Sequence, residues 1–209
     1  MVSADHEVPN RQVQRSERST EALLDAAADL IAEGGLASMT FAAIGARAGY
    51  SRGLVTARFG SKAGLVEALI RRVWSRLRDA GIVPLTTGVD GLASLMGLID
   101  GIHQQAISNH RDMRAMNALI FEALSADDDL RDRMAEFNDA MHDEIADALR
   151  RGVEDGSVSA TVDPGRAAMV VTSALVGIAY QWLLHADDFD LAAAYGALRT
   201  DVRTALAAR

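Results

Sequence analysis

The fold is decided by the stretch MTFAAIGARAGYSRGLVTARFGSKAGLVEAL, which spans residues 39–69. Thr40 is a typical helix N-cap, and helix-forming residues follow it. Gly49 is able to adopt the positive φ of a tight turn. Ser51 is then in place to cap a second helix, which we expect to reach Phe59. The order of these signals predicts a helix-turn-helix.

Packing of the two short helices requires a small residue where they cross and apolar residues behind the crossing. Gly45 supplies the small residue. The apolar side chains are Ile44, Val55 and Phe59. The exposed face of the second helix then carries short or cationic donors, which suit base edges and phosphates. These donors are Ser51, Arg52, Thr56 and Arg58. An ordinary helical hairpin is the alternative interpretation.

Charge is unevenly distributed along the chain, whose formal net charge is −8. Residues 34–66 carry four basic residues and no acidic residue, whereas residues 81–209 carry 10 basic and 20 acidic residues. This asymmetry indicates that one short segment approaches an anionic partner while the rest repels it. It also argues against an ordinary hairpin, although a solvated cationic patch stays an alternative.

The composition favours an intracellular helical protein. Hydrophobic residues make up 49% of the 209 residues, enough for a sizeable core, and there is no cysteine. No disulfide framework and no thiolate zinc site are therefore expected. The N-terminal residues lack the apolar core of a signal peptide, and we find no uncharged apolar run near the length of a membrane span. We therefore expect a cytoplasmic protein without a membrane partner.

Helical periodicity extends on both sides of the quoted stretch. Apolar residues predict a first helix over residues 16–33, which the glycine pair 34–35 ends. The same spacing predicts a fourth helix over residues 62–79. Further helices are predicted over residues 89–108, 110–125, 128–154, 164–185 and 189–207. Because no alternating strand pattern occurs, we predict an all-α protein of about nine helices.

The quoted stretch resembles the DNA-binding domain of the TetR family of transcriptional regulators. The preceding LLDAAADLIAEGGLASMT, residues 23–40, resembles the first helix and glycine-ended turn of that family. GIAYQWLLHADDFDL, residues 177–191, resembles a segment of its C-terminal domains less specifically. The motif residues are Thr40, Ile44, Ala48, Gly49, Ser51, Gly53, Phe59, Ser61, Lys62 and Leu65.

The resemblance implies a three-part chain. Residues 1–15 are polar and aperiodic, and this pattern itself predicts a flexible arm. The resemblance implies that residues 16–62 form a helix-turn-helix DNA-binding domain and residues 63–209 an effector-binding and dimerisation domain. The implied function is a repressor that a small molecule releases from operator DNA, with activation as an open alternative. The implied partners are double-stranded DNA, a largely apolar effector and a second copy of the chain.

The resemblance also implies roles for the matching residues. Thr40 and Lys62 would contact phosphates. Arg52, Gly53 and Leu54 would face the major groove at the start of the recognition helix. The full predicted DNA-binding set is Thr40, Ser51, Arg52, Gly53, Leu54, Thr56, Arg58 and Lys62.

Two positions depart from the family pattern. The family usually has an aromatic residue at the position of Thr56 and a histidine or tyrosine at the position of Arg58. Thr56 offers no surface for packing on the DNA backbone. Arg58 adds a charge that suits either a phosphate or a guanine, and the sequence leaves that choice open.

The middle helices carry a predicted effector cavity. Methionine and aromatic side chains suit an adaptable apolar site, and plain core packing is the alternative for each of them. The predicted lining is Trp74, Met96, Ile99, His103, Met116, Asn117, Ile120, Phe137 and Met141.

The last two helices carry a predicted homodimer interface. Their small and apolar residues favour a four-helix bundle with two helices from each subunit, and packing within one subunit is the alternative. The predicted interface is Met169, Ser173, Gly177, Tyr180, Gln181, Leu191, Tyr195, Leu198 and Val202.

Two other functional classes stay open. The missing aromatic residue at Thr56 would permit a helical small-molecule carrier or sensor that does not bind DNA. An all-α enzyme would use His142 or His103 with nearby carboxylates, but we find no pairing of a base with a nucleophile. We therefore expect no enzymatic activity and no cofactor. We also expect no metal site, because Asp139 and Asp143 fit a solvated helix face.

Overall fold

The computed structural model describes residues 11–77, 88–125, 128–185 and 188–208. These ranges contain nine α-helices and no strand, so the all-α prediction is confirmed for them. The first four are α1 (Arg11–Ser38), α2 (Phe41–Ala48), α3 (Arg52–Phe59) and α4 (Lys62–Leu77). The others are α6 (Gly91–Ser108), α7 (His110–Glu122), α8 (Asp128–Asp155), α9 (Pro164–Leu184) and α10 (Leu191–Leu206).

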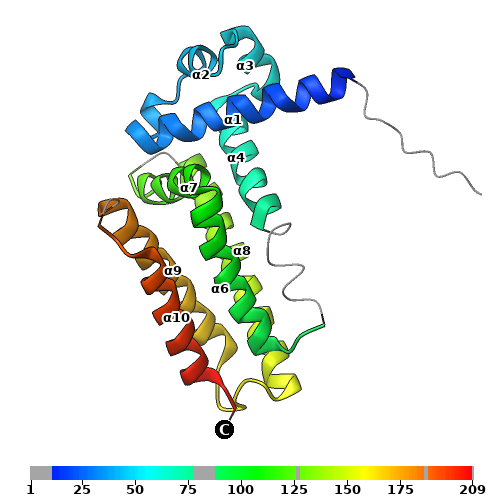
Figure 1. Cartoon of the computed structure of the whole chain (residues 1–209), viewed down its shortest axis with the longest axis vertical. Helices are drawn as coiled ribbons and strands as arrows, with labels where there is room; N and C mark the ends of the chain where they lie inside the picture. The colour runs from blue at the N-terminus through cyan, green and yellow to red at the C-terminus, as the bar shows by residue number, and fades with distance from the viewer. Residues whose placement is uncertain (1–10, 78–87, 126–127, 186–187, 209) are drawn as a thin grey trace, which may run out of the picture.

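The helices form two parts (Figure 1). At one end of the molecule, α1, α2 and α3 lie together, while α6, α8, α9 and α10 run toward the end that holds the C-terminus. α4 leads from the first part into the second, and α7 lies across the bundle against α1. The packing of α1 on α7 therefore joins the two parts.

α1 is kinked at the glycine pair, where the sequence predicts its end, and it begins earlier than predicted. Gly35 has a φ of 67°, in the left-handed region, so the regular helix stops at the glycine pair. At the other end, residues 11–15 belong to α1, although we assigned them to a flexible arm. They read RQVQR, and arginine and glutamine are good helix formers, so the helix extends through them. Residues 1–10 of the predicted arm lie outside the described residues.

Aspartate side chains cap three helices of the C-terminal part. Asp90, Asp163 and Asp190 accept hydrogen bonds of 2.7, 3.1 and 2.9 Å from backbone N–H groups three residues on. Each carboxylate also places negative charge at the positive end of a helix dipole. The caps fix the starting residues of α6, α9 and α10, and thereby the register of the faces that these helices bury.

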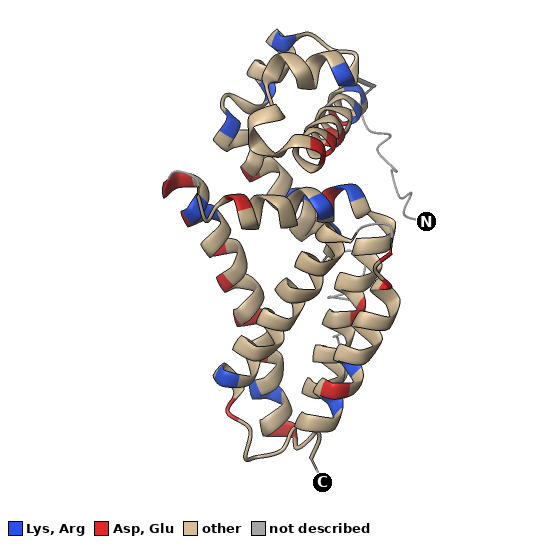
Figure 2. Cartoon of the chain, turned by 90° about the vertical axis from the view of Figure 1, so that its left-hand side faces the viewer, with Lys and Arg blue, Asp and Glu red and all other residues tan. Residues whose placement is uncertain are grey.

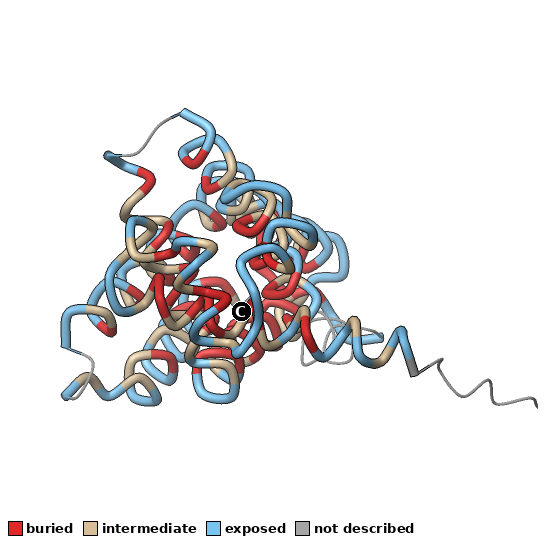
Figure 3. Tube along the Cα trace, turned by 90° about the horizontal axis from the view of Figure 1, so that it is seen from above, coloured by how far each residue is buried: buried red, intermediate tan, exposed pale blue. Residues whose placement is uncertain are grey.

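Buried residues of both parts belong to one core cluster. The view along the long axis in Figure 3 shows buried segments toward the middle of the molecule and exposed segments around them. Leu23 and Ile44 are fully buried in the N-terminal part. Leu65 and Leu69 continue the core along α4, and Ile99 belongs to it in the C-terminal part. Because α4 packs against helices of both parts, a displacement of α4 affects both.

α9 is unusually apolar. Among the described residues it is long and apolar enough to cross a membrane by length and composition, which corrects our expectation that no such stretch exists. In the structure it packs against α7, α8 and α10, and 33% of its most apolar window is buried. Its exposed side includes Met169, Val170 and Tyr180. α9 therefore has an inner face within the bundle and an apolar outer face.

Candidate nucleic-acid interface and effector cavity

The helix-turn-helix is built by two caps and one close backbone approach. Thr40 and Ser51 accept hydrogen bonds of 3.1 and 3.2 Å from backbone N–H groups three residues on. At the crossing of α2 and α3, a Cβ on Gly45 would lie 2.7 Å from the carbonyl oxygen of Tyr50. Gly49 ends α2 with a φ of 76°. Each predicted requirement of the turn is therefore met by the predicted residue.

α3 turns one side toward the core and the other toward solvent. Val55 is fully buried, and Leu54 and Phe59 are half-buried against the core. Leu54, which we expected to face the major groove, thus has part of its side chain in the packing of the domain. The predicted DNA-binding residues that are exposed are Thr40, Ser51, Arg52, Gly53, Thr56 and Lys62.

Arg58 differs from its predicted role. Its guanidinium donates hydrogen bonds to Ser16 Oγ at 2.7 Å and to Ser19 Oγ at 3.3 Å, and these contacts are partly buried. Both hydroxyls lie on α1, so the hydrogen bonds of Arg58 link the end of α3 to α1. With its donors turned inward, Arg58 is a structural contact in this conformation rather than a contact to a base or a phosphate.

The other cations near α3 differ in how they are held. Arg47 pairs with Glu33 at 2.7 Å, and this hydrogen bond lowers the pKa of Glu33 below its ordinary value. Lys62 is exposed and donates a 3.1 Å hydrogen bond to the carbonyl oxygen of Leu36. Within the described ranges, the side chain of Arg52 makes no ion pair and no hydrogen bond. Arg52 is therefore the cation of α3 whose donors are free.

A charged cluster lies where α1, α4 and α7 meet. Asp112 on α7 is buried and accepts hydrogen bonds from Arg72 and from Arg76, the latter at 2.6 Å. Arg72, also buried, pairs in addition with Asp25 at 3.0 Å and with Glu21 at 3.3 Å on α1. Burial raises the pKa of Asp112, and the two guanidiniums oppose that rise. The cluster ties the first helix to both α4 and α7.

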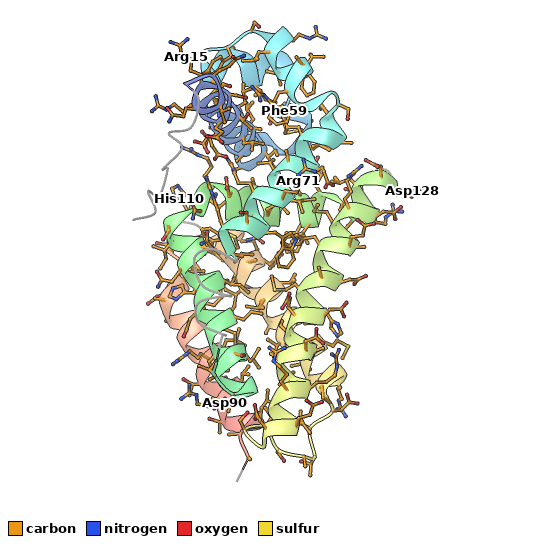
Figure 4. The ribbon with its side chains drawn as sticks, turned by 90° about the vertical axis from the view of Figure 1, so that its right-hand side faces the viewer. Arg15, Phe59, Arg71, Asp90, His110 and Asp128 are labelled. Atoms are coloured by element: carbon orange, nitrogen blue, oxygen red, sulfur yellow. The ribbon has the colours of Figure 1, made fainter. Side chains whose placement is uncertain are left out.

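A second contact joins α7 to the turn after α1. The Glu122 carboxylate accepts a 2.7 Å hydrogen bond from the backbone N–H of Leu36. The same carboxylate lies 2.9 Å from where a Cβ on Gly35 would be. Figure 4 labels His110, at the start of α7, below Phe59, at the end of α3. The carboxylate thus sits against the glycine turn that precedes the helix-turn-helix.

The C-terminal part contains a narrow apolar cavity, which we call the chamber. Its volume is about 60 Å³, enough for a few water molecules. Its lining is Leu77, Ile102, Met113, Met116, Asn117, Ile120, Phe137, Asn138, Met141, Thr172, Leu175, Val176, Ala179 and Tyr195. Five predicted lining residues are in this set: Met116, Asn117, Ile120, Phe137 and Met141. The methionine side chains are flexible, so the chamber is able to widen around a ligand.

The other four predicted lining residues lie elsewhere. Met96 and Ile99 are buried in the core, which agrees with the core-packing alternative. Trp74 packs behind Phe137, with ring centroids 5.2 Å apart. His103 stacks on Tyr195 at 4.9 Å and lies behind the chamber wall. The sequence therefore predicts the part of the chamber lining that α7 and α8 contribute.

The lining that sequence reasoning missed comes mainly from the last two helices. Thr172, Leu175 and Ala179 contribute from α9, and Tyr195 contributes from α10. The sequence predicts a dimer interface on these two helices and does not predict that their inward faces line a cavity. Thr172, a polar residue within the apolar repeat of α9, is the sequence feature that indicates this part of the lining.

Comparison with known families decides the classification. Residues 23–69 match the family model described as bacterial regulatory proteins, tetR family. Residues 108–207 match the model described as BetI-type transcriptional repressor, C-terminal. The chain belongs to the TetR family. The resemblance read from residues 39–69 is thereby confirmed, and it extends into the C-terminal part.

Curated relatives match part of this TetR-family chain. The HTH-type transcriptional regulator BetI of Klebsiella pneumoniae (strain 342) is 38% identical over 95 residues, which cover 44% of the chain and 49% of that relative. BetI of Escherichia coli O17:K52:H18 is 36% identical over 95 residues, with the same coverage of the two chains. The chain thus spans about half the length of the curated relatives it matches.

Solved structures agree with the fold over most of the chain. A TetR-family transcriptional regulator from Rhodococcus sp. has a TM-score of 0.76 at 25% identity, covering 90% of this chain and 98% of that one. The SmeT–triclosan complex has a TM-score of 0.76 at 23% identity, covering 91% and 92%. The regulator FadR from Bacillus halodurans has a TM-score of 0.78 at 20% identity, covering 91% and 97%. These likenesses show the TetR-family fold.

The outer face of α9 holds most of the predicted dimer residues of this TetR-family protein. Met169, Ser173, Gly177, Tyr180 and Gln181 are exposed, with exposed fractions of 56% for Met169 and 46% for Tyr180. A side chain at Gly177 would meet nothing within 4 Å. This face is therefore open within one subunit.

On α10 the dimer prediction is corrected at two positions. Tyr195 and Val202 have exposed fractions of 5% and 8%, so both are buried within the subunit. Tyr195 faces the chamber, and burial raises the pKa of its hydroxyl. Leu191 and Leu198 are half-buried against the core. The apolar repeat of α10 therefore packs mainly inside its own subunit.

Charge in this TetR-family fold is segregated as the sequence predicts. In Figure 2 basic residues lie at the outer end of the N-terminal part, and the acidic residues of that part lie on α1, which also carries Arg15 and Arg18. Residues 34–66, which include α2 and α3, hold no acidic residue. The outer side of the helix-turn-helix therefore presents positive charge without nearby carboxylates from its own segment.

Proposed function

We propose that this TetR-family chain is a cytoplasmic transcriptional repressor, without enzymatic activity, that binds operator DNA as a homodimer and is released by a small-molecule effector. The observation that carries the proposal is the outer face of α3. Ser51, Arg52 and Thr56 are exposed there, and the guanidinium of Arg52 is unengaged in the described part of the chain. Such donors suit base edges and phosphates of the major groove.

A homodimer is supported by the outer face of α9. Met169, Val170 and Tyr180 expose large apolar side chains along it, and such a patch on a soluble protein commonly marks an interface. Two subunits joined through this face would present two copies of α3. Specific binding then requires the copies to be about 34–36 Å apart, one turn of DNA.

Release by an effector requires the chamber to be coupled to α3, and α4 and α7 support that coupling. Leu77 of α4 and Met116 of α7 line the chamber. One turn or so away on the same helices, Arg72 and Asp112 hold α1 through the charged cluster. A ligand that widens the chamber would displace α4 and α7 and change the separation of the two α3 helices. It must bind the DNA-incompetent state more tightly than the competent one.

DNA binding at two salt concentrations tests the proposal. The probe is duplex DNA from upstream of the coding sequence of this chain, with unrelated duplex as the control. We expect specific binding that weakens steeply with salt, because phosphate contacts release counterions. Arg52→Ala should relax sequence specificity, whereas Lys62→Ala should weaken binding to all duplexes alike. If both variants bind like the parent, the proposed contacts are wrong.

A carrier or sensor without DNA binding is the second candidate. Two observations favour it: Thr56 offers no aromatic surface, and Arg58 is engaged by Ser16 and Ser19 rather than free. This candidate predicts ligand binding together with equal, weak binding to every duplex. Specific retention of the upstream duplex would exclude it.

A further inference from the structure

A groove between α8 and α9 adjoins the chamber. The groove has a volume of about 420 Å³, and it shares Asn138, Thr172 and Val176 with the chamber. The rest of its lining is Asp139, His142, Met169 and Ser173. The shared residues define a neck. The neck therefore lies between an apolar interior and a more polar groove.

The neck contains a buried hydroxyl without a partner. Thr172 is 7% exposed, and its Oγ1 makes no hydrogen bond within the described part of the chain. Helical threonines commonly bond the carbonyl four residues earlier, and Thr172 does not. A buried unpaired hydroxyl is unfavourable, so a group that pairs with it gains affinity. Asn138, from α8, supplies a second polar group to the same neck.

The charges along this space restrict the ligand. Neither the chamber nor the groove is lined by Arg or Lys, and the groove holds the carboxylate of Asp139. An anionic head group would meet no Arg or Lys there, and the imidazole of His142 in the groove already contacts the carboxylate of Asp143 at 3.3 Å. A cationic group in the chamber would meet no carboxylate and would lose its hydration. Uncharged ligands therefore fit both compartments best.

We propose that the effector is an uncharged amphipathic molecule whose apolar body occupies the chamber and whose hydroxyl or carbonyl group hydrogen-bonds to Thr172 at the neck. Thr172 is then the residue that sets specificity for the polar end. The inference rests on the proposed function, in which the chamber binds the effector. It adds the chemical class of that effector and the residue that binds its polar end.

Four probes with one phenylpropyl body test the class: 3-phenylpropanol, propylbenzene, 3-phenylpropanoate and 3-phenylpropylammonium. Binding to the full-length protein is measured by calorimetry without DNA. A single neutral hydrogen bond corresponds to about a fivefold affinity gain, so the alcohol should bind about fivefold more tightly than propylbenzene. The two charged probes should bind at least about tenfold more weakly than the alcohol.

Three variants locate the polar contact. Thr172→Val should remove the advantage of the alcohol over propylbenzene while leaving propylbenzene binding unchanged. Thr172→Ser keeps a hydroxyl and should retain the advantage. Thr200→Val, at an exposed position of α10 that lines neither the chamber nor the groove, should retain it as well. Thermal unfolding of ligand-free Thr172→Val should match or exceed that of the parent, because the change removes an unpaired buried hydroxyl.

The inference is overturned if either charged probe binds most tightly, if no probe binds, or if Thr172→Val keeps the preference for the alcohol. These outcomes are separate from the test of the proposed function. Specific DNA binding with no probe binding would overturn the inference alone. The predicted ranking of probes without specific DNA binding would overturn the proposed repressor and leave the ligand class supported.

Discussion

The carboxylate of Glu122, on α7, accepts a 2.7 Å hydrogen bond from the backbone N–H of Leu36, in the turn that follows the glycine pair of α1. α7 also contributes Met116 to the chamber. One helix therefore contacts both the candidate effector cavity and the turn that positions α2.

Glu122→Ala should destabilise the turn before α2. The substitution leaves the N–H of Leu36 without its acceptor, and a lost hydrogen bond to a charged group is expected to reduce the free energy of unfolding by about 1.5–3 kcal/mol. Urea denaturation measures the change, and amide exchange at Leu36 should accelerate. Glu144→Ala, at an exposed position of α8, is the matched control and should change stability little. Equal effects of the two variants would contradict the role assigned to Glu122.

Asp112→Asn should be strongly destabilising. The change leaves the buried guanidinium of Arg72 without its buried carboxylate, and breaking such a pair from one side costs about 3–5 kcal/mol. Chemical denaturation at neutral pH provides the measurement. Asp132→Asn, exposed on α8, serves as the comparison. A loss below about 1 kcal/mol for Asp112→Asn would show that the partners of Arg72 on α1 suffice.

Gly45→Ala should disrupt the crossing of α2 and α3. The added Cβ would lie 2.7 Å from the carbonyl oxygen of Tyr50, which is a backbone atom and cannot swing away. We expect a loss of stability of about 1–3 kcal/mol and a loss of DNA affinity. Gly53→Ala is the control for stability, because a Cβ there would meet Ser51 Oγ at 3.7 Å. In α3 it should keep or raise the melting temperature. Similar melting temperatures for the two variants would contradict the prediction.

Gly177→Arg should dissociate the dimer without unfolding the subunit. A side chain at Gly177 meets nothing within 4 Å in the subunit, whereas a charged group on the proposed α9 face would be buried by a partner. Sedimentation velocity should show a shift from dimer to monomer, and circular dichroism should be unchanged. Gln104→Arg, exposed on α6, should leave the assembly intact. A dimeric Gly177→Arg variant would place the interface elsewhere.

The helix-turn-helix was predictable because its signals are local. Thr40 and Ser51 cap helices through N–H groups three residues away, and Gly49 takes its positive φ within one turn. No long-range information is needed to read these features. The same holds for the glycine pair that ends the first helix.

Contacts between distant segments were not predictable. Arg58 donates hydrogen bonds to Ser16 and Ser19 on α1, which lie 42 and 39 residues earlier in the chain. No local sequence pattern predicts these contacts. Tyr195 was assigned to the wrong face because α10 carries apolar residues on more than one side. Tyr195 is buried because α10 packs on α6 and α9, and this tertiary packing cannot be read from the sequence of α10.

On α9, neighbouring positions in the sequence serve different surfaces. Thr172 lines the chamber, while Ser173, the next residue, lies on the exposed side that we propose for the partner subunit. Inserting or deleting one residue near the start of this helix would therefore rotate both surfaces at once. In the proposed function, a new effector specificity would therefore arise by point substitutions along α9, since a length change there would alter the proposed dimer face and the chamber lining together.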